Sequence, residues 1–142
     1  MNVNFFFEDI SSFPFDEKLY TNWVELVAAG HGKEAGDINF IFCSDEYLLA
    51  LNREHLNHDY YTDIITFDYV EDDLINGDLF ISIDRVKENA TSYGVSFQNE
   101  FSRVIIHGIL HLCGFPDKTG EEAKVMRENE DAALRILEKL QD

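Results

Sequence analysis

Two histidines, His107 and His111, stand four residues apart in an apolar run that begins at Val104. On a helix, four residues turn the chain by about 400°, so both imidazoles leave the same face. One metal ion can then be bound by both rings, and the spacing predicts a metal site on a helix. The alternative is a pair of core histidines that form hydrogen bonds with their neighbours.

The turn after the second histidine offers a third ligand. Gly114 stands where a helix would end in a left-handed residue, and Pro116 prevents the helix from continuing. The chain therefore reverses and brings Asp117 back toward the imidazoles. Two imidazoles and one carboxylate form a recurring catalytic zinc shell, which leaves a fourth position for water. Alternatively, Asp117 caps the next helix beside Thr119, and the ion is held by two histidines and solvent.

The same motif argues against a zinc peptidase. Such peptidases carry a glutamate directly after the first histidine, where it acts as the general base. This chain has Gly108 at that position, so nothing in the motif would deprotonate an attacking water.

The stretch resembles the signature of the YbeY family, bacterial rRNA maturation factors described as metal-dependent single-strand endoribonucleases. That signature reads His-Gly-x-Leu-His-Leu-x-Gly-Tyr-Asp-His. The matching residues here are His107, Gly108, Leu110, His111, Leu112 and Gly114, with Phe115 in place of the tyrosine. The last position is a histidine ligand in the family and is Asp117 in this chain.

Residues 51–67 extend the resemblance. The matching residues are Leu51, Asn52, Thr62, Asp63 and Phe67, with Thr66 in place of a serine. The arginine that is often proposed to act on RNA in the family falls on Leu56, so Arg53, one helical turn earlier, is the candidate catalytic replacement. The resemblance also makes Asn52, Thr62 and Arg103 candidates for substrate binding. His55 and His58 are expected to be solvated loop histidines.

The resemblance covers nearly the whole chain and implies a cytoplasmic endoribonuclease. Its expected substrate is single-stranded RNA in rRNA maturation and ribosome biogenesis, including the 3′ end of 16S rRNA. The expected cofactor is one Zn²⁺, or another divalent ion, and the expected partners are a ribosomal subunit or assembly proteins, with no DNA and no membrane. Two other classes stay open: a metal hydrolase of another substrate, and a non-catalytic ribosome assembly factor with a structural metal.

The charge of the chain argues against ordinary nucleic-acid binding. Its 28 acidic and 11 basic residues give a net charge of −17, whereas phosphate neutralisation supplies much of the usual affinity for nucleic acids. We therefore expect Arg53 and Arg103, with the metal, to form a local positive cleft beside the histidines. The alternative is that both arginines form exposed salt bridges.

Length and composition predict one folded domain spanning residues 1–142. Hydrophobic residues make up 45% of the chain, which is enough for a core. No apolar run is long enough for a transmembrane helix, and the N-terminus lacks the features of a secretory signal. Cys43 and Cys113 lie far apart and are expected to be reduced thiols.

The pattern predicts an α+β fold: a mixed four-stranded sheet packed with about five helices, with the helix carrying His-Gly-x-Leu-His at the centre. Strands are expected at residues 3–7, 37–43, 64–70 and 78–83, with a hairpin turn over residues 71–77. Helices are expected at residues 16–30, 45–55 and 84–93, after Ser96, and after a capping box of Thr119 and Glu122. Core positions on the first and last helices are Leu19, Trp23, Leu26, Val27, Met126, Ala133, Leu137 and Leu140.

Overall fold

The computed structural model describes residues 2–142 and shows a four-stranded mixed sheet with five helices, which confirms the predicted α+β class. The strands lie in the order β1-β2-β4-β3. The first three of these run parallel, and the last is antiparallel to its neighbour at the edge of the sheet. Their bounds are Asn2–Phe7 for β1, Glu34–Cys43 for β2, Ile64–Asp68 for β3 and Leu74–Ser82 for β4.

Polar side chains begin each helix by accepting a hydrogen bond from a backbone N–H of the first turn. The helices are α1 (Glu17–Gly30), α2 (Asp45–His55), α3 (Ile83–Tyr93), α4 (Phe97–Leu112) and α5 (Gly120–Gln141), and their caps are Asp16, Ser44, Ser82, Ser96 and Thr119. The predicted capping box at α5 is confirmed, because Thr119 and Glu122 bind each other's backbone.

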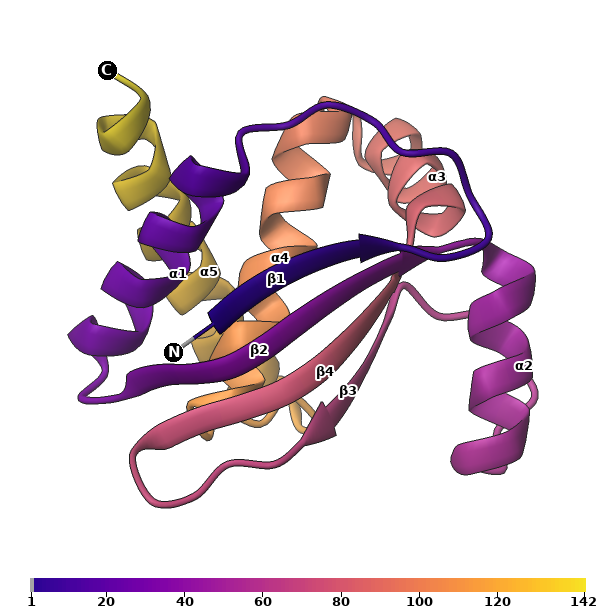
Figure 1. Ribbon diagram of the computed structural model, residues 1–142, viewed down its shortest axis with the longest axis horizontal. Helices are drawn as coiled ribbons and strands as arrows, with labels where there is room; N and C mark the ends of the chain where they lie inside the picture. Colours follow the sequence, from indigo (N-terminus) through magenta and orange to yellow (C-terminus); the bar gives the residue numbers. More distant parts are fainter. Residues whose placement is uncertain (1) are drawn as a thin grey trace.

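Alternation along the strands divides the apolar side chains between the two faces of the sheet. Phe40 of β2 and Leu79 of β4 are fully buried in the main core, which α1, α3, α4 and α5 cover. Ile65 of β3 points to the other face, where Leu48 of α2 packs against it. Figure 1 shows α4 crossing behind the sheet with α1 and α5 beside it, while α2 stands apart at the opposite end.

The hairpin between β3 and β4 is present, but its turn is shorter than predicted. The chain reverses at Asp72, which has a positive φ of 54°, and Glu71 already pairs with Leu74. Asn76 and Gly77, expected in the turn, lie inside β4 instead. The reason is a contact with the neighbouring strand: the Asn76 side chain accepts a hydrogen bond from Asp37 N, at the register shift of β2.

Two of the predicted core positions are wrong. Leu26 and Leu140 are 49% and 37% exposed. On α1 the buried stripe is rotated toward Tyr20, whose hydroxyl pairs with buried Ser102 of α4. Leu140 lies in the last turn of α5, beyond Leu137, the last buried residue of that helix.

None of the helices within residues 2–142 is long and apolar enough to span a bilayer. Both cysteines are free thiols, as predicted. Burial raises the pKa of Cys43 to about 12 and that of Cys113 to about 11, so neither is a reactive thiolate at neutral pH.

Candidate metal centre

Helix α4 holds His107 and His111 on one face, one turn apart. Their ring centroids are 4.6 Å apart, with the ring planes at 88°. Gly108, between them, faces the sheet, and a Cβ there would collide with the side chains of Leu79 and Ile64. The missing side chain therefore lets the helix approach β3 and β4 closely beside the histidines. This contact gives a structural reason for glycine at the position where a peptidase would carry its glutamate.

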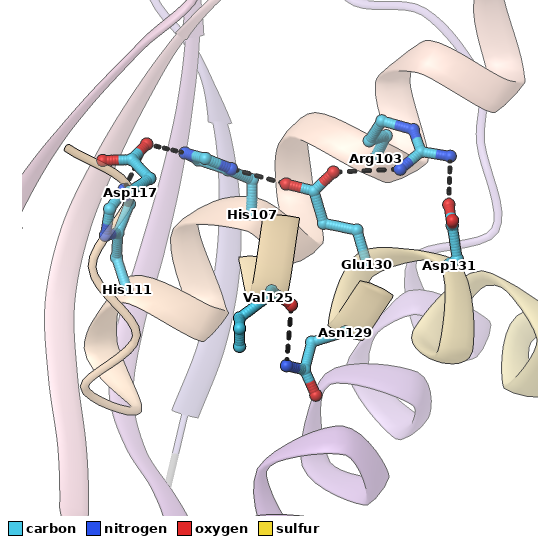
Figure 2. A network of polar contacts seen from close by, with 8 residues as sticks. All are labelled: Arg103, His107, His111, Asp117, Val125, Asn129, Glu130 and Asp131. Atoms are coloured by element: carbon cyan, nitrogen blue, oxygen red, sulfur yellow. Dashed lines mark hydrogen bonds and ion pairs between the residues drawn. The ribbon is translucent and has the colours of Figure 1, made fainter. Parts of the chain in front are cut away.

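The turn after α4 brings Asp117 to both imidazoles, as predicted. Gly114 has a φ of 102°, in the left-handed region, and its N–H donates to the carbonyl of His111. The Asp117 Oδ2 atom then lies 3.2 Å from Nε2 of His107 and 3.3 Å from Nε2 of His111. Figure 2 shows the carboxylate facing both rings.

These spacings fit a single bound ion. Donor atoms at about 2.0–2.2 Å from a tetrahedral zinc ion lie about 3.3–3.6 Å from one another. His107, His111 and Asp117 form a group of metal-binding type whose ligand atoms all lie within 4.8 Å of one another. The alternative in which Asp117 caps α5 is wrong, because the cap of that helix is Thr119. The donor set therefore fits a metal with three protein ligands.

Glu130 of α5 orients the first histidine from behind. Its Oε2 accepts a hydrogen bond of 2.6 Å from Nδ1 of His107, which leaves Nε2 free to face Asp117. Its Oε1 accepts a bond of 2.9 Å from Arg103, whose guanidinium also binds Asp131. Figure 2 shows this chain of contacts from the candidate ligands to the surface of α5.

The carboxylates around His107 control its protonation. Burial alone would lower its pKa, but the hydrogen bond and charge of Glu130, together with Asp117 and Asp63, raise the pKa of His107 above its ordinary value. Burial raises the pKa of Asp63 in turn, while the charge of His107 acts in the opposite direction. The site thus concentrates negative charge around one imidazole, which favours a bound cation.

A cavity of about 620 Å³ opens in front of the three candidate ligands. Two of the predicted substrate-binding residues, Asn52 and Thr62, line it. A smaller cavity of about 320 Å³ adjoins His107 and is lined by Arg103 and Glu130, among others. Both volumes border the same imidazole, so the histidine pair lies at the edge of open space.

The two arginines do not form the expected positive cleft. Arg103 is next to His107, but its guanidinium is bound by Glu130 and Asp131. Arg53 is exposed, forms an ion pair with Asp59 and is not among the residues that line the larger cavity. The alternative of exposed salt bridges describes Arg53, whereas the ion pair of Arg103 with Glu130 is largely buried.

The structure adds residues that the sequence motifs did not single out as site residues. Glu130 has a sequence signal: it is an acid on the apolar stripe of α5, four residues after Met126 and three before Ala133. Asp63 lines the larger cavity beside His107. His58 is an exposed loop residue, as predicted, and also lines that cavity. His55 is half exposed but is the last residue of α2, and it packs edge-on against Phe67.

Comparisons with known proteins agree with this geometry. The family model described as Endoribonuclease YbeY matches residues 8–138. Proteins named Endoribonuclease YbeY from Parabacteroides distasonis and Bacteroides thetaiotaomicron are 51% and 49% identical over 137 and 136 residues, covering 96% of this chain and 96% and 99% of theirs. The solution structure of TM1509 from Thermotoga maritima is similar with a TM-score of 0.65 and 25% identity, over 99% of this chain and 96% of that one.

Proposed function

The chain belongs to the YbeY family of endoribonucleases, and on that premise we propose that it hydrolyses single-stranded RNA with one zinc ion held by His107, His111 and Asp117. The observation that carries this proposal is the position of the Asp117 carboxylate, 3.2 and 3.3 Å from the two Nε2 atoms and open to the larger cavity. The expected pathway is rRNA maturation, at the 3′ end of 16S rRNA, with ribosomal partners.

The side chains of the site have separate tasks in this proposal. His107, His111 and Asp117 would hold the ion, and Glu130 keeps the His107 ring in the tautomer that leaves Nε2 free. A bound divalent ion would polarise a phosphate oxygen and acidify a nearby water. Thr62 borders the cavity in which the phosphate would lie. A catalytic role for Arg53 stays a prediction, as does RNA binding by Asn52 and Arg103.

The geometry favours a catalytic over a structural metal. Structural zinc sites are closed shells of four protein ligands, whereas this group has three and borders a cavity. Its side chains are 23%, 30% and 36% exposed for His107, His111 and Asp117. The two histidines also stand on α4, whose other face is buried, and Glu130 orients His107. We therefore expect the fold to persist without the metal.

Substrate class is tested with the zinc-loaded chain and four substrates. Three are nucleic acids of one sequence, namely single-stranded RNA, double-stranded RNA and single-stranded DNA, and the fourth is a small phosphodiester. We expect cleavage of the single-stranded RNA alone. Cleavage of the small phosphodiester without RNA cleavage would favour the metal hydrolase of another substrate. Binding to ribosomal subunits without any hydrolysis would favour the assembly factor.

Removal of the metal separates a catalytic ion from a structural one. We expect a chelator to abolish RNA cleavage while circular dichroism and cooperative thermal unfolding persist, because the hydrophobic core between the sheet and the helices includes none of the three candidate ligands. Added zinc should restore cleavage. Loss of the cooperative transition in the metal-free chain would contradict the proposal and favour a structural ion.

Zinc affinity should depend on pH through the two imidazoles. A histidine must be neutral to bind metal, and its ordinary pKa is about 6.5. Despite its burial, the pKa of His107 is raised above that value by the carboxylates around it. Protons therefore already compete with zinc above a pH of about 6.5, and the affinity should decrease as the pH falls. Isothermal titration at several pH values between about 8 and 5 measures this. An affinity that stays constant over the range would exclude His107 and His111 as ligands.

A further inference from the structure

The loop between α2 and β3 forms one wall of the larger cavity, which the candidate metal ligands also line. Leu56, His58 and Tyr60 of this loop line the cavity together with His107 and His111. Leu56 is apolar, His58 and Tyr60 are aromatic, and Tyr60 is 55% exposed. The same cavity is thus lined by the candidate metal ligands and by two aromatic rings.

His58 and Tyr60 form a stacked aromatic pair on this wall. Their ring centroids are 5.1 Å apart and the ring planes meet at 21°. The hydroxyl of Tyr60 also pairs with Nδ1 of His58 at 2.9 Å. Two rings held nearly parallel at the mouth of a cavity provide a flat surface on which a third planar ring can stack.

Asn52 fixes the pair in place from the end of α2. Only 1% of Asn52 is exposed, and its side-chain amide donates a hydrogen bond to the carbonyl of Tyr60. Its backbone carbonyl accepts a bond from His58 N, after Asn57 has turned the chain with a φ of 56°. The backbone of the loop is therefore ordered before any ligand arrives, which reduces the entropy lost on binding.

Charge indicates what kind of contact must bind the substrate. The acids Asp63, Asp68 and Asp117 line the cavity, and Lys118 is its one Lys or Arg among the described residues. The whole chain carries −17. Phosphate neutralisation is therefore a weak source of affinity here. Stacking of bases on aromatic rings does not need a basic surface and is worth about 1–3 kcal/mol per base.

From these contacts we propose that His58 and Tyr60 are a base-stacking platform that positions single-stranded RNA across the metal centre. A base of the strand stacks on the aromatic pair, and the adjoining backbone reaches His107, His111 and Asp117 through the shared cavity. This proposal rests on the proposed function and adds a substrate-binding element to it. It also explains a preference for single strands, because a base in a duplex is already paired and stacked.

The test is binding of a single-stranded RNA that contains 2-aminopurine, whose fluorescence is quenched by stacking. The zinc-loaded chain and the RNA are mixed rapidly, so that binding is recorded before cleavage. We expect Tyr60→Ala to weaken binding about 5- to 150-fold and to reduce the quench. Tyr60→Phe keeps the ring and should stay within about twofold of the unchanged chain, since only the bond to His58 is lost.

Tyr69→Ala is the matched control. Tyr69 is 56% exposed, close to the value for Tyr60, but it does not line the cavity. Its removal should leave binding and quench unchanged. If the unchanged chain cleaves the RNA and Tyr60→Ala binds and cleaves it equally well, the platform is wrong and the proposed function stands. If the unchanged chain neither binds nor cleaves single-stranded RNA, both proposals are overturned.

Discussion

Asp117→Ala will lose zinc and RNA cleavage while it keeps its fold. The carboxylate supplies one of three ligand atoms, so we expect zinc affinity to fall by more than the roughly 10- to 100-fold that removal of an outer-shell partner causes. In the metal-free protein Asp117 contributes only ion pairs with two histidines, at 36% exposure. The free energy of unfolding without metal should therefore change by less than about 1 kcal/mol.

Two further variants make this prediction specific. Asp117→His should retain zinc, because imidazole nitrogen binds zinc at about 2.0–2.1 Å and carboxylate oxygen at about 2.0–2.2 Å. Asp68→Ala removes the same charge from the same cavity, but Asp68 is not in the ligand group and binds Val70 N instead. It should bind zinc like the unchanged chain. Full zinc occupancy in Asp117→Ala, measured by metal analysis after gel filtration, would refute the assignment.

The sequence was most informative where one short segment determines the geometry. The spacing of His107 and His111 is enough to place both rings on one face of α4, and Gly114 is enough to reverse the chain. These features depend on neighbours within about ten residues. The grouping of these candidate ligands could therefore be predicted before the sheet or the other helices were known.

Contacts between distant segments could not be predicted in the same way. Glu130 is 23 residues from His107, and only the packing of α5 against α4 brings their side chains to 2.6 Å. The expected cleft with Arg53 and Arg103 failed for a similar reason. Each arginine meets a carboxylate that spacing along the chain does not identify, Asp59 in a loop and Glu130 on another helix.

Within the sheet, the errors came from residues that usually mark turns. Asn76 and Gly77 read as a turn, but Gly77 is needed inside β4, where a Cβ would approach Phe67 O at 2.9 Å and the side chain of Leu112 at 3.1 Å. The sequence alone does not distinguish a glycine required by close packing from a glycine required by a turn. The neighbouring contacts, which the sequence alone does not show, decide between the two.

Glu130→Gln is expected to lower zinc affinity about 10- to 100-fold, although Glu130 is not itself a proposed ligand of the ion. In the unchanged chain its carboxylate accepts the Nδ1–H of His107 and is only 6% exposed. The amide of glutamine is a weaker acceptor and can present its NH₂ group instead, so the ring loses both its preferred tautomer and its orientation. The pKa of His107 in the metal-free protein should fall, since Glu130 supports the protonated ring.

Asp131→Asn separates this positioning role from general stability. Asp131 shares Arg103 with Glu130 but makes no contact with His107 in the network of Figure 2. Each substitution removes one of the two carboxylate charges that pair with the Arg103 guanidinium, so both should lower thermal stability. Only Glu130→Gln should change zinc affinity and the imidazole ¹⁵N shifts that report the tautomer of His107. Equal loss of zinc affinity in the two variants would mean that Glu130 acts through Arg103 and stability, and that the hydrogen bond to His107 does not position the ligand.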